Sequence, residues 1–181
     1  VYSDILGYDK VVYDVTGVSG DLAGFPGGSK NVRRVLLRCS TPFSGPFSKI
    51  FGQSEIELIS SIDTPGKKIF EGRYWGDPGF IHICFDIRGM DELKEHCKNM
   101  GFPFRVDSKM SHDGNSFDMG EAAGHFAYIE DPDGTLIEFV ETHKIPVLKK
   151  IGWYLDLRKR EPHKSLPEWI LRTLRFSRVR T

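Results

Sequence analysis

Apolar and polar residues alternate along residues 80–87, which is the period of a strand buried on one face. Its apolar side consists of Ile81, Ile83 and Phe85, and its polar side consists of His82, Cys84 and Asp86. The spacing then changes to that of a helix with one apolar stripe, formed by Met90, Leu93, Cys97 and Met100. Gly101 follows, at the position where a left-handed residue commonly ends a helix. The pattern therefore predicts a strand and then a helix that ends at Gly101.

Three more strands are predicted downstream of this helix, over residues 104–108, 126–130 and 136–141. A polar, glycine-containing stretch over residues 111–124 is expected to be a loop. The last two strands are joined by Asp131-Pro132-Asp133-Gly134, whose residues favour a tight hairpin turn. Residues 80–142 are therefore expected to form a βαβββ module.

The first half of the chain repeats this order over residues 1–62, except that the opening strand is absent. Gly7-Tyr8 ends a predicted helix over residues 1–6, as Gly101-Phe102 ends the later helix. Three strands follow, over residues 10–15, 32–39 and 55–60. Since His82 lies 19 residues before Gly101, the matching position in the first module falls before Val1. We therefore expect a truncated amino terminus.

Two further segments complete the predicted organisation. Residues 63–79 are rich in proline and glycine and form a connector between the modules. Residues 143–181 form a carboxy-terminal extension, in which Ser165-Leu166-Pro167-Glu168 begins an amphipathic helix. The apolar stripe of this helix consists of Leu166, Trp169, Ile170 and Leu174.

Charge is distributed unevenly along the chain, although the formal net charge is zero. Residues 1–142 contain 14 Lys and Arg against 22 Asp and Glu, whereas residues 143–181 contain 11 against 3. Because the two parts cancel, we expect the basic extension to dock on its own acidic body or on a second subunit. No nucleic-acid or membrane partner is expected.

The composition is that of a folded globular protein of 181 residues, 39% of them apolar. The three cysteines are odd in number and lack CxxC spacing, which is typical of thiols in a reducing compartment. No apolar run is long enough to cross a bilayer, and nothing at the start resembles a signal peptide. We expect a cytoplasmic protein.

Three polar residues are embedded in otherwise apolar strand segments. Glu57 and Glu138 hold matching positions in the last strand of each module, and His82 lies in the opening strand of the second. An unpaired carboxylate or imidazole in such a segment is destabilising, so the three residues need a common explanation. A shared metal ion is the simplest one. The alternative is a hydrogen-bonded core histidine and two glutamates on a wet sheet face.

Two segments resemble a known family. They are Gly79-Phe80-Ile81-His82-Ile83-Cys84-Phe85, and the stretch 127–141, in which Asp131-Pro132-Asp133-Gly134 precedes Ile137-Glu138-Phe139. Both are similar to the vicinal oxygen chelate superfamily, which includes bleomycin resistance proteins and extradiol dioxygenases, and most of all to glyoxalase I. The resemblance covers residues 1 to about 142.

This resemblance implies an α+β fold in which two βαβββ modules form an open, curved mixed sheet around a metal cleft, often in a homodimer. By position, Glu57, His82 and Glu138 match three of the four metal ligands, and the fourth would lie upstream of Val1. Zn or Ni is favoured as the ion, with Fe or Mn as alternatives. Such an ion stabilises an enediolate while a carboxylate moves the proton, so the implied activity is a metal-dependent lyase or isomerase of glyoxalase type on a small α-hydroxycarbonyl or thiohemiacetal.

In this scheme Glu138 is both ligand and general base, Glu57 is a ligand and a second proton carrier, and His82 is a ligand only. Arg34 and Arg38 are weaker candidates for substrate binding, as is His125. Glutathione is a candidate co-substrate, although no motif for a thiol conjugate is readable.

Two alternative functions fit the same fold. An extradiol-type dioxygenase would hold Fe(II) with two histidines and one carboxylate. A drug-binding or ligand-binding member of the superfamily would bind its ligand in the cleft of the curved sheet without a metal.

Overall fold

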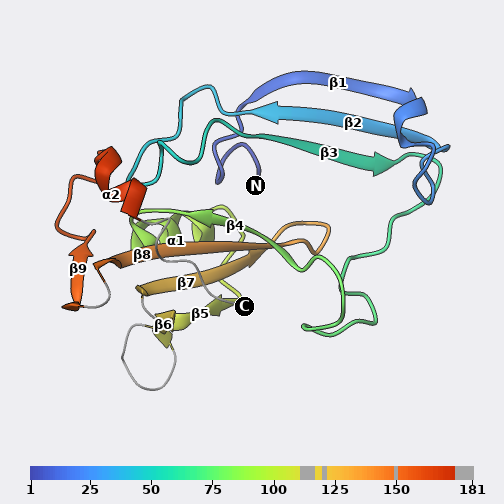
Figure 1. Ribbon diagram of the computed structural model, residues 1–181. Coiled ribbons are helices and arrows are strands. Elements are labelled where there is room, and N and C mark those ends of the chain that lie inside the picture. The colour runs from blue at the N-terminus through green and yellow to red at the C-terminus, as the bar shows by residue number, and fades with distance from the viewer. Residues whose placement is uncertain (111–116, 120–121, 149–150, 174–181) are drawn as a thin grey trace. The chain divides into compact units, whose positions relative to one another are not determined.

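The structure is a computed structural model that describes residues 1–110, 117–119, 122–148 and 151–173. The chain divides into two compact units. The first unit contains Val1–Pro42 and Gln53–Trp75, and the second contains Phe43–Gly52 and Gly76–Thr181. Each unit is built on a sheet of its own (Figure 1).

The first unit contains a three-stranded antiparallel sheet (Figure 1). Its strands are β1 (Lys10–Val18), β2 (Asn31–Arg38) and β3 (Glu55–Ser61), in the order β1-β2-β3. A short 3-10 helix, η1 (Gly20–Leu22), follows β1. The three predicted strands are confirmed, and β3 is an edge strand of this three-stranded sheet.

The expected helix over residues 1–6 is only a hydrogen-bonded turn. The amides of Ile5 and Gly7 donate to the carbonyls of Val1 and Ser3 at 2.9 and 3.0 Å. Two such bonds are too few to propagate a helix, because its first turn costs more entropy than one bond returns. The end of this turn still matches the end of the later helix, as predicted, because Gly7 and Gly101 are both left-handed, with φ of 78° and 84°.

The second unit has a six-stranded mixed sheet with the order β4-β8-β7-β5, in which β6 pairs with β7 and β9 pairs with β8. Its strands are β4 (His82–Asp86), β5 (Val106–Asp107), β6 (Phe117–Met119), β7 (Ala122–Glu130), β8 (Leu136–Leu148) and β9 (Trp153–Asp156). The helix α1 (Met90–Asn99) and the short η2 (Ser108–Met110) complete the module. Because β4 runs parallel to β8 and the other pairs are antiparallel, the predicted βαβββ order is confirmed.

The predicted loop over residues 111–124 is wrong in part, because β6 and the first residues of β7 pair as a ladder, with Phe117 opposite Gly124. Backbone hydrogen bonds form this ladder without the apolar alternation by which a strand is recognised in a sequence. Residues 111–116 and 120–121 of the predicted loop lie outside the described residues.

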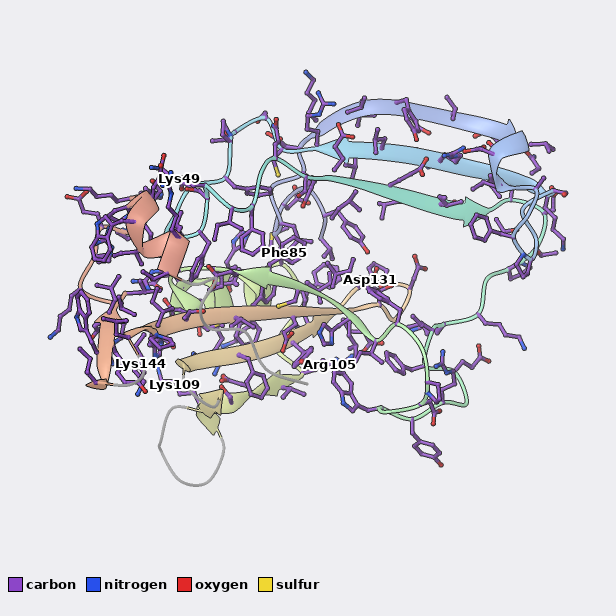
Figure 2. All side chains as sticks on the ribbon, viewed as in Figure 1. Lys49, Phe85, Arg105, Lys109, Asp131 and Lys144 are labelled. Carbon is purple, nitrogen blue, oxygen red and sulfur yellow. The ribbon has the colours of Figure 1, made fainter. Side chains whose placement is uncertain are left out.

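The turn between β7 and β8 is the predicted tight hairpin, and Asp131 lies at its start (Figure 2). One carboxylate oxygen of Asp131 accepts the amides of Asp133 and Thr135 at 2.9 and 2.7 Å. Gly134 supplies the left-handed residue, with φ of 87°. The turn fixes the register that places Tyr128 opposite Glu138.

The helix α1 covers one face of the second sheet. Lys94 on α1 forms an ion pair of 2.7 Å with Asp107 on β5, and Met90 and Cys97 of α1 are buried. Ile137 and Phe139 of β8 are buried on this face. By alternation, the side chain of Glu138, which lies between Ile137 and Phe139, points to the opposite face.

The carboxy-terminal extension is part of the second unit. β8 continues to Leu148, and β9 pairs back on it. The helix α2 (Glu168–Thr173) follows. Of the expected apolar stripe, Leu166, just before α2, and Ile170 are buried, Trp169 is exposed, and Leu174 lies outside the described residues. Leu166 and Ile170 form a buried cluster with Ile145 and Leu157. Across the described residues, no helix is both long enough and apolar enough to span a membrane.

Candidate functional site

The second unit brings His82 and Glu138 together. The parallel pairing of β4 with β8 places Cys84 opposite Glu138, so His82, two residues earlier on β4, shares the face of Glu138. The His82 Nε2 atom lies 3.1 Å from Glu138 Oε2, and the two side chains are 24% and 15% exposed. An imidazole nitrogen and a carboxylate oxygen therefore converge on the sheet face that α1 leaves uncovered.

Two neutral donors complete the surroundings of Glu138. The Tyr128 hydroxyl on β7 donates to Glu138 Oε1 at 2.5 Å, and the Tyr128 ring contacts the His82 ring edge-on. Desolvation, and then the Glu138 carboxylate, raise the pKa of the Cys84 thiol to about 12. Burial, and then the bond to Glu138, likewise raise the pKa of Tyr128. Both groups are therefore protonated at neutral pH and act as hydrogen-bond donors.

Glu57 in the first unit has different partners. Arg34 on β2 donates from Nε to Glu57 Oε1 at 2.6 Å and from Nη2 to Glu57 Oε2 at 3.1 Å. The Tyr13 hydroxyl on β1 donates to Glu57 Oε1 as well. The Arg34 guanidinium, and then the Tyr13 hydroxyl, lower the pKa of Glu57. Glu57 is thus an ionised carboxylate that is already paired with the Arg34 cation.

The other arginine candidates also contact carboxylates. The Nη1 atom of Arg34 lies 2.8 Å from a carboxylate oxygen of Asp21, just after β1. Arg38 pairs with Glu55 across β2 and β3. Both arginines, predicted as weak substrate ligands, are therefore engaged within their own sheet.

His125 lies on the opposite face of the second sheet from His82 and Glu138. Its Nε2 atom lies 2.6 Å from Asp107 Oδ1, and both side chains are almost fully buried on the side of α1. The structure thus places this weak candidate in a charged network with Lys94 rather than beside Glu138.

The residues of the second unit fit half of a metal site. His82 and Glu138 offer the nitrogen and oxygen donors that Zn or Ni accepts, within reach of one another. Glu57 does not offer a vacant oxygen, because both of its oxygens accept hydrogen bonds from Arg34. Nowhere in the described part of the chain do three or more His, Cys, Asp or Glu side chains form a group able to hold a metal ion.

Sequence reasoning missed the partners of the glutamates. The alternation along residues 81–85 places Cys84 on the face of His82, so its position beside Glu138 was readable. Tyr128 lies three residues after His125 on β7, so alternation places it on the face opposite His125. The contact of Tyr13 with Glu57 had no sequence signal, because the two lie on strands separated by β2 and the register shifts near Tyr13.

Comparison with known proteins identifies the fold. No protein-family model matches the sequence, and no curated protein matches it. Among solved structures, the glyoxalase family protein from Bacillus cereus is 17% identical, with a TM-score of 0.51 over 76% of this chain and 83% of that chain. The glyoxalase family protein from Enterococcus faecalis is 17% identical, with a TM-score of 0.49 over 77% and 82%. Lactoylglutathione lyase from Agrobacterium tumefaciens is 18% identical, with a TM-score of 0.35 over 77% and 79%.

At these identities, the likeness to the Bacillus cereus protein shows a fold and not an activity. This chain has an α+β fold similar to that of the glyoxalase family protein from Bacillus cereus. The fold expected from the two sequence segments is confirmed.

Proposed function

We propose that this protein is a metal-dependent lyase or isomerase of glyoxalase type, which transfers a proton within a small α-hydroxycarbonyl or thiohemiacetal. One observation carries the proposal: His82 Nε2 and Glu138 Oε2 lie 3.1 Å apart on the face opposite α1 of a glyoxalase-like sheet. A histidine nitrogen and a carboxylate oxygen are among the donors that a catalytic Zn site uses.

In the proposed reaction Glu138 is the general base. When its Oε2 atom is not bound to an ion, it accepts the proton from the substrate carbon and returns it to the neighbouring carbon, while Tyr128 holds Oε1 and orients the carboxylate. His82 and Glu138 would hold the ion. A divalent ion bound there would stabilise the negative charge that develops on the substrate oxygens.

The test measures bound metal together with isomerisation of the hemithioacetal of methylglyoxal and glutathione. Glu138→Gln is expected to lower kcat by at least about 100-fold, because it removes the base and a ligand, while the fold is retained. Glu141→Gln is the matched control, since Glu141 lies on the same strand but accepts the Gly89 amide on the side of α1. Substantial residual activity in Glu138→Gln, or equal losses in both variants, would contradict the proposal.

A second function is favoured by the contacts of Glu57. Because Arg34 already neutralises that carboxylate, the contacts of Glu57 would also suit a ligand-binding protein that works without a metal. Elemental analysis of the purified full-length protein separates the two functions. The enzyme is expected to retain about one ion per chain, and the binding protein none.

A further inference from the structure

An exposed apolar patch lies where β9 pairs with the carboxy-terminal end of β8. It consists of Leu148, Ile151, Trp153 and Trp169, which are 49%, 74%, 45% and 54% exposed. Leu148 and Trp153 are cross-strand partners, and the rings of Trp153 and Trp169 stack with their centroids 6.3 Å apart. The tryptophan patch, as we call these four residues, therefore joins the end of β8, the start of β9 and the helix α2, all within the second unit (Figure 1).

The packing of the extension does not account for the tryptophan patch. The extension buries a separate set of side chains in the second unit, formed by Ile145, Leu157, Leu166 and Ile170. On α2, Ile170 is buried in this cluster, whereas the preceding Trp169 is presented to solvent. A contiguous apolar patch that folding leaves exposed marks an interaction surface.

The surroundings of the tryptophan patch are aromatic and basic. On the same pair of strands, the ammonium group of Lys144 lies over the ring of Tyr154, 5.1 Å from its centroid, and both side chains are exposed. The described residues of the extension, 143–148 and 151–173, contain six Lys and Arg against three Asp and Glu. Protruding aliphatic side chains, tryptophan and tyrosine rings, and an excess of cations together suit the surface of a bilayer that contains anionic lipids.

We propose that the tryptophan patch, with Lys144 and Tyr154 beside it, docks this protein on the surface of an anionic lipid bilayer. This binding goes beyond the proposed function and does not depend on it, and it departs from the expectation of no membrane partner. Leu148 and Ile151 enter the boundary between the headgroups and the acyl chains, and the tryptophans lie at the depth of the headgroups. Lys144 contacts the lipid phosphates.

A second protein chain and a nucleic acid fit the tryptophan patch less well. The exposed parts of its four side chains amount to a few hundred Å², whereas a stable interface between two proteins buries about 800 Å² on each. Single-stranded nucleic acids stack their bases on free aromatic faces, but here the two tryptophan rings stack on each other. Leu148 and Ile151 offer no aromatic face, whereas the edge of the acyl region accepts aliphatic side chains.

The experiment is co-sedimentation of the full chain with vesicles of phosphatidylcholine, either alone or with about 30% phosphatidylserine. The wild type is expected to partition at least about tenfold more strongly onto the anionic vesicles. Ile151→Asp is expected to weaken this binding about tenfold or more, because a carboxylate replaces a side chain that enters the lipid. Ile62→Asp is the matched control, since Ile62 is a 51% exposed isoleucine of the first unit. It adds the same charge outside the patch and should change the binding by less than about twofold.

Tryptophan emission shows whether the patch itself enters the lipid. With Trp75 replaced by Phe, the remaining tryptophans are Trp153 and Trp169. Their emission is expected to shift to shorter wavelength on anionic vesicles, and unchanged emission of bound protein would overturn the proposal. Circular dichroism checks that each variant is folded. If Ile151→Asp is unfolded, then Ile151→Ala decides, with an expected loss of at least about threefold, and unchanged binding overturns the proposal.

The remaining outcomes also decide the proposal, and the hemithioacetal assay tests the proposed function separately. If the folded wild type does not bind anionic vesicles, the proposal is overturned. If Ile151→Asp binds as well as the wild type, or Ile62→Asp loses as much, the binding is general electrostatics and the proposal fails. If sedimentation velocity shows a wild-type dimer that Ile151→Asp dissociates, the patch is an interface between copies and the proposal fails. If a labelled single-stranded oligonucleotide binds in place of the vesicles, the patch is a nucleic-acid site and the proposal is likewise overturned.

Discussion

Leu166→Ala tests whether the carboxy-terminal extension is part of the folded core of the second unit. Leu166 is fully buried against Ile145 and Leu157, with Ile170 and the partly buried Phe47 beside it. The substitution removes three buried carbon atoms, which loses about 2.4 kcal/mol of transfer free energy. The remaining cavity adds about 1 kcal/mol. We therefore expect the free energy of unfolding of this unit to fall by about 3 kcal/mol.

Tryptophan fluorescence during urea unfolding measures this change. Trp153 on β9 and Trp169 on α2 stack with ring centroids 6.3 Å apart, so their emission reports directly on the extension. Replacing Trp75 of the first unit by Phe in every protein removes the background signal. The control is Ile151→Ala, because Ile151 is 74% exposed and its loss should change the free energy by less than about 0.5 kcal/mol.

Two results would refute this reasoning. A loss below about 1 kcal/mol for Leu166→Ala would mean that the buried cluster does not support the unit. A variant in which the tryptophan signal melts early, while the second sheet keeps its full stability by circular dichroism, would show that the extension folds independently of that sheet.

Three further predictions concern the polar groups of the second unit and the metal. Tyr128→Phe should lower kcat about tenfold with little change in KM, because Glu138 loses the hydrogen bond that orients it. Steady-state kinetics measures both constants, and a change in KM alone would contradict this prediction. Burial raises the pKa of Asp107, but the bonds from Lys94 and His125 outweigh this effect, so its pKa is lowered from the ordinary 3.8. Asp107→Asn should therefore destabilise the unit by about 2 kcal/mol at pH 7, and the gap to the wild type should shrink as the pH falls below about 4, as measured by urea unfolding at each pH. A gap that is constant with pH would contradict this ion pairing. Treatment with a chelator should leave both units folded, because their described glutamates have hydrogen-bond donors without an ion, and an apoprotein that is unfolded by circular dichroism would show that a metal holds the fold.

The order of elements could be predicted because each rests on local patterns. Alternation along residues 80–87 predicts β4, and helical spacing up to Gly101 predicts α1. The structure contains both elements, within two residues of the expected bounds. The turn after Asp131 was predictable for the same reason, since its carboxylate and Gly134 act on neighbouring backbone groups. Recognition of the repeat then predicted the order of strands in both halves of the chain.

Features that depend on contacts between distant residues were not predictable. The ladder of β6 with β7 needs only backbone pairing, so it leaves no trace in the hydrophobic pattern. The pairing of β9 with β8 extends the sheet beyond residue 142, where the predicted module ends. The choice of Arg34 as the partner of Glu57 depends on the register of β2 with β3 and on a side-chain rotamer, and neither is encoded in a local spacing.

The contacts of the two module glutamates separate folding from metal binding. A carboxylate in a strand is destabilising only while its oxygens are unsatisfied, and here each finds its donors within its own unit: Arg34 and Tyr13 for Glu57, and Tyr128 for Glu138. Neither glutamate therefore requires an ion to complete its hydrogen bonds, in contrast to ligands that have no other partner. A metal that binds this protein would compete with existing donors rather than fill a gap. Its affinity should therefore be set by how easily those donors yield, and neutral donors yield more easily than a bidentate guanidinium.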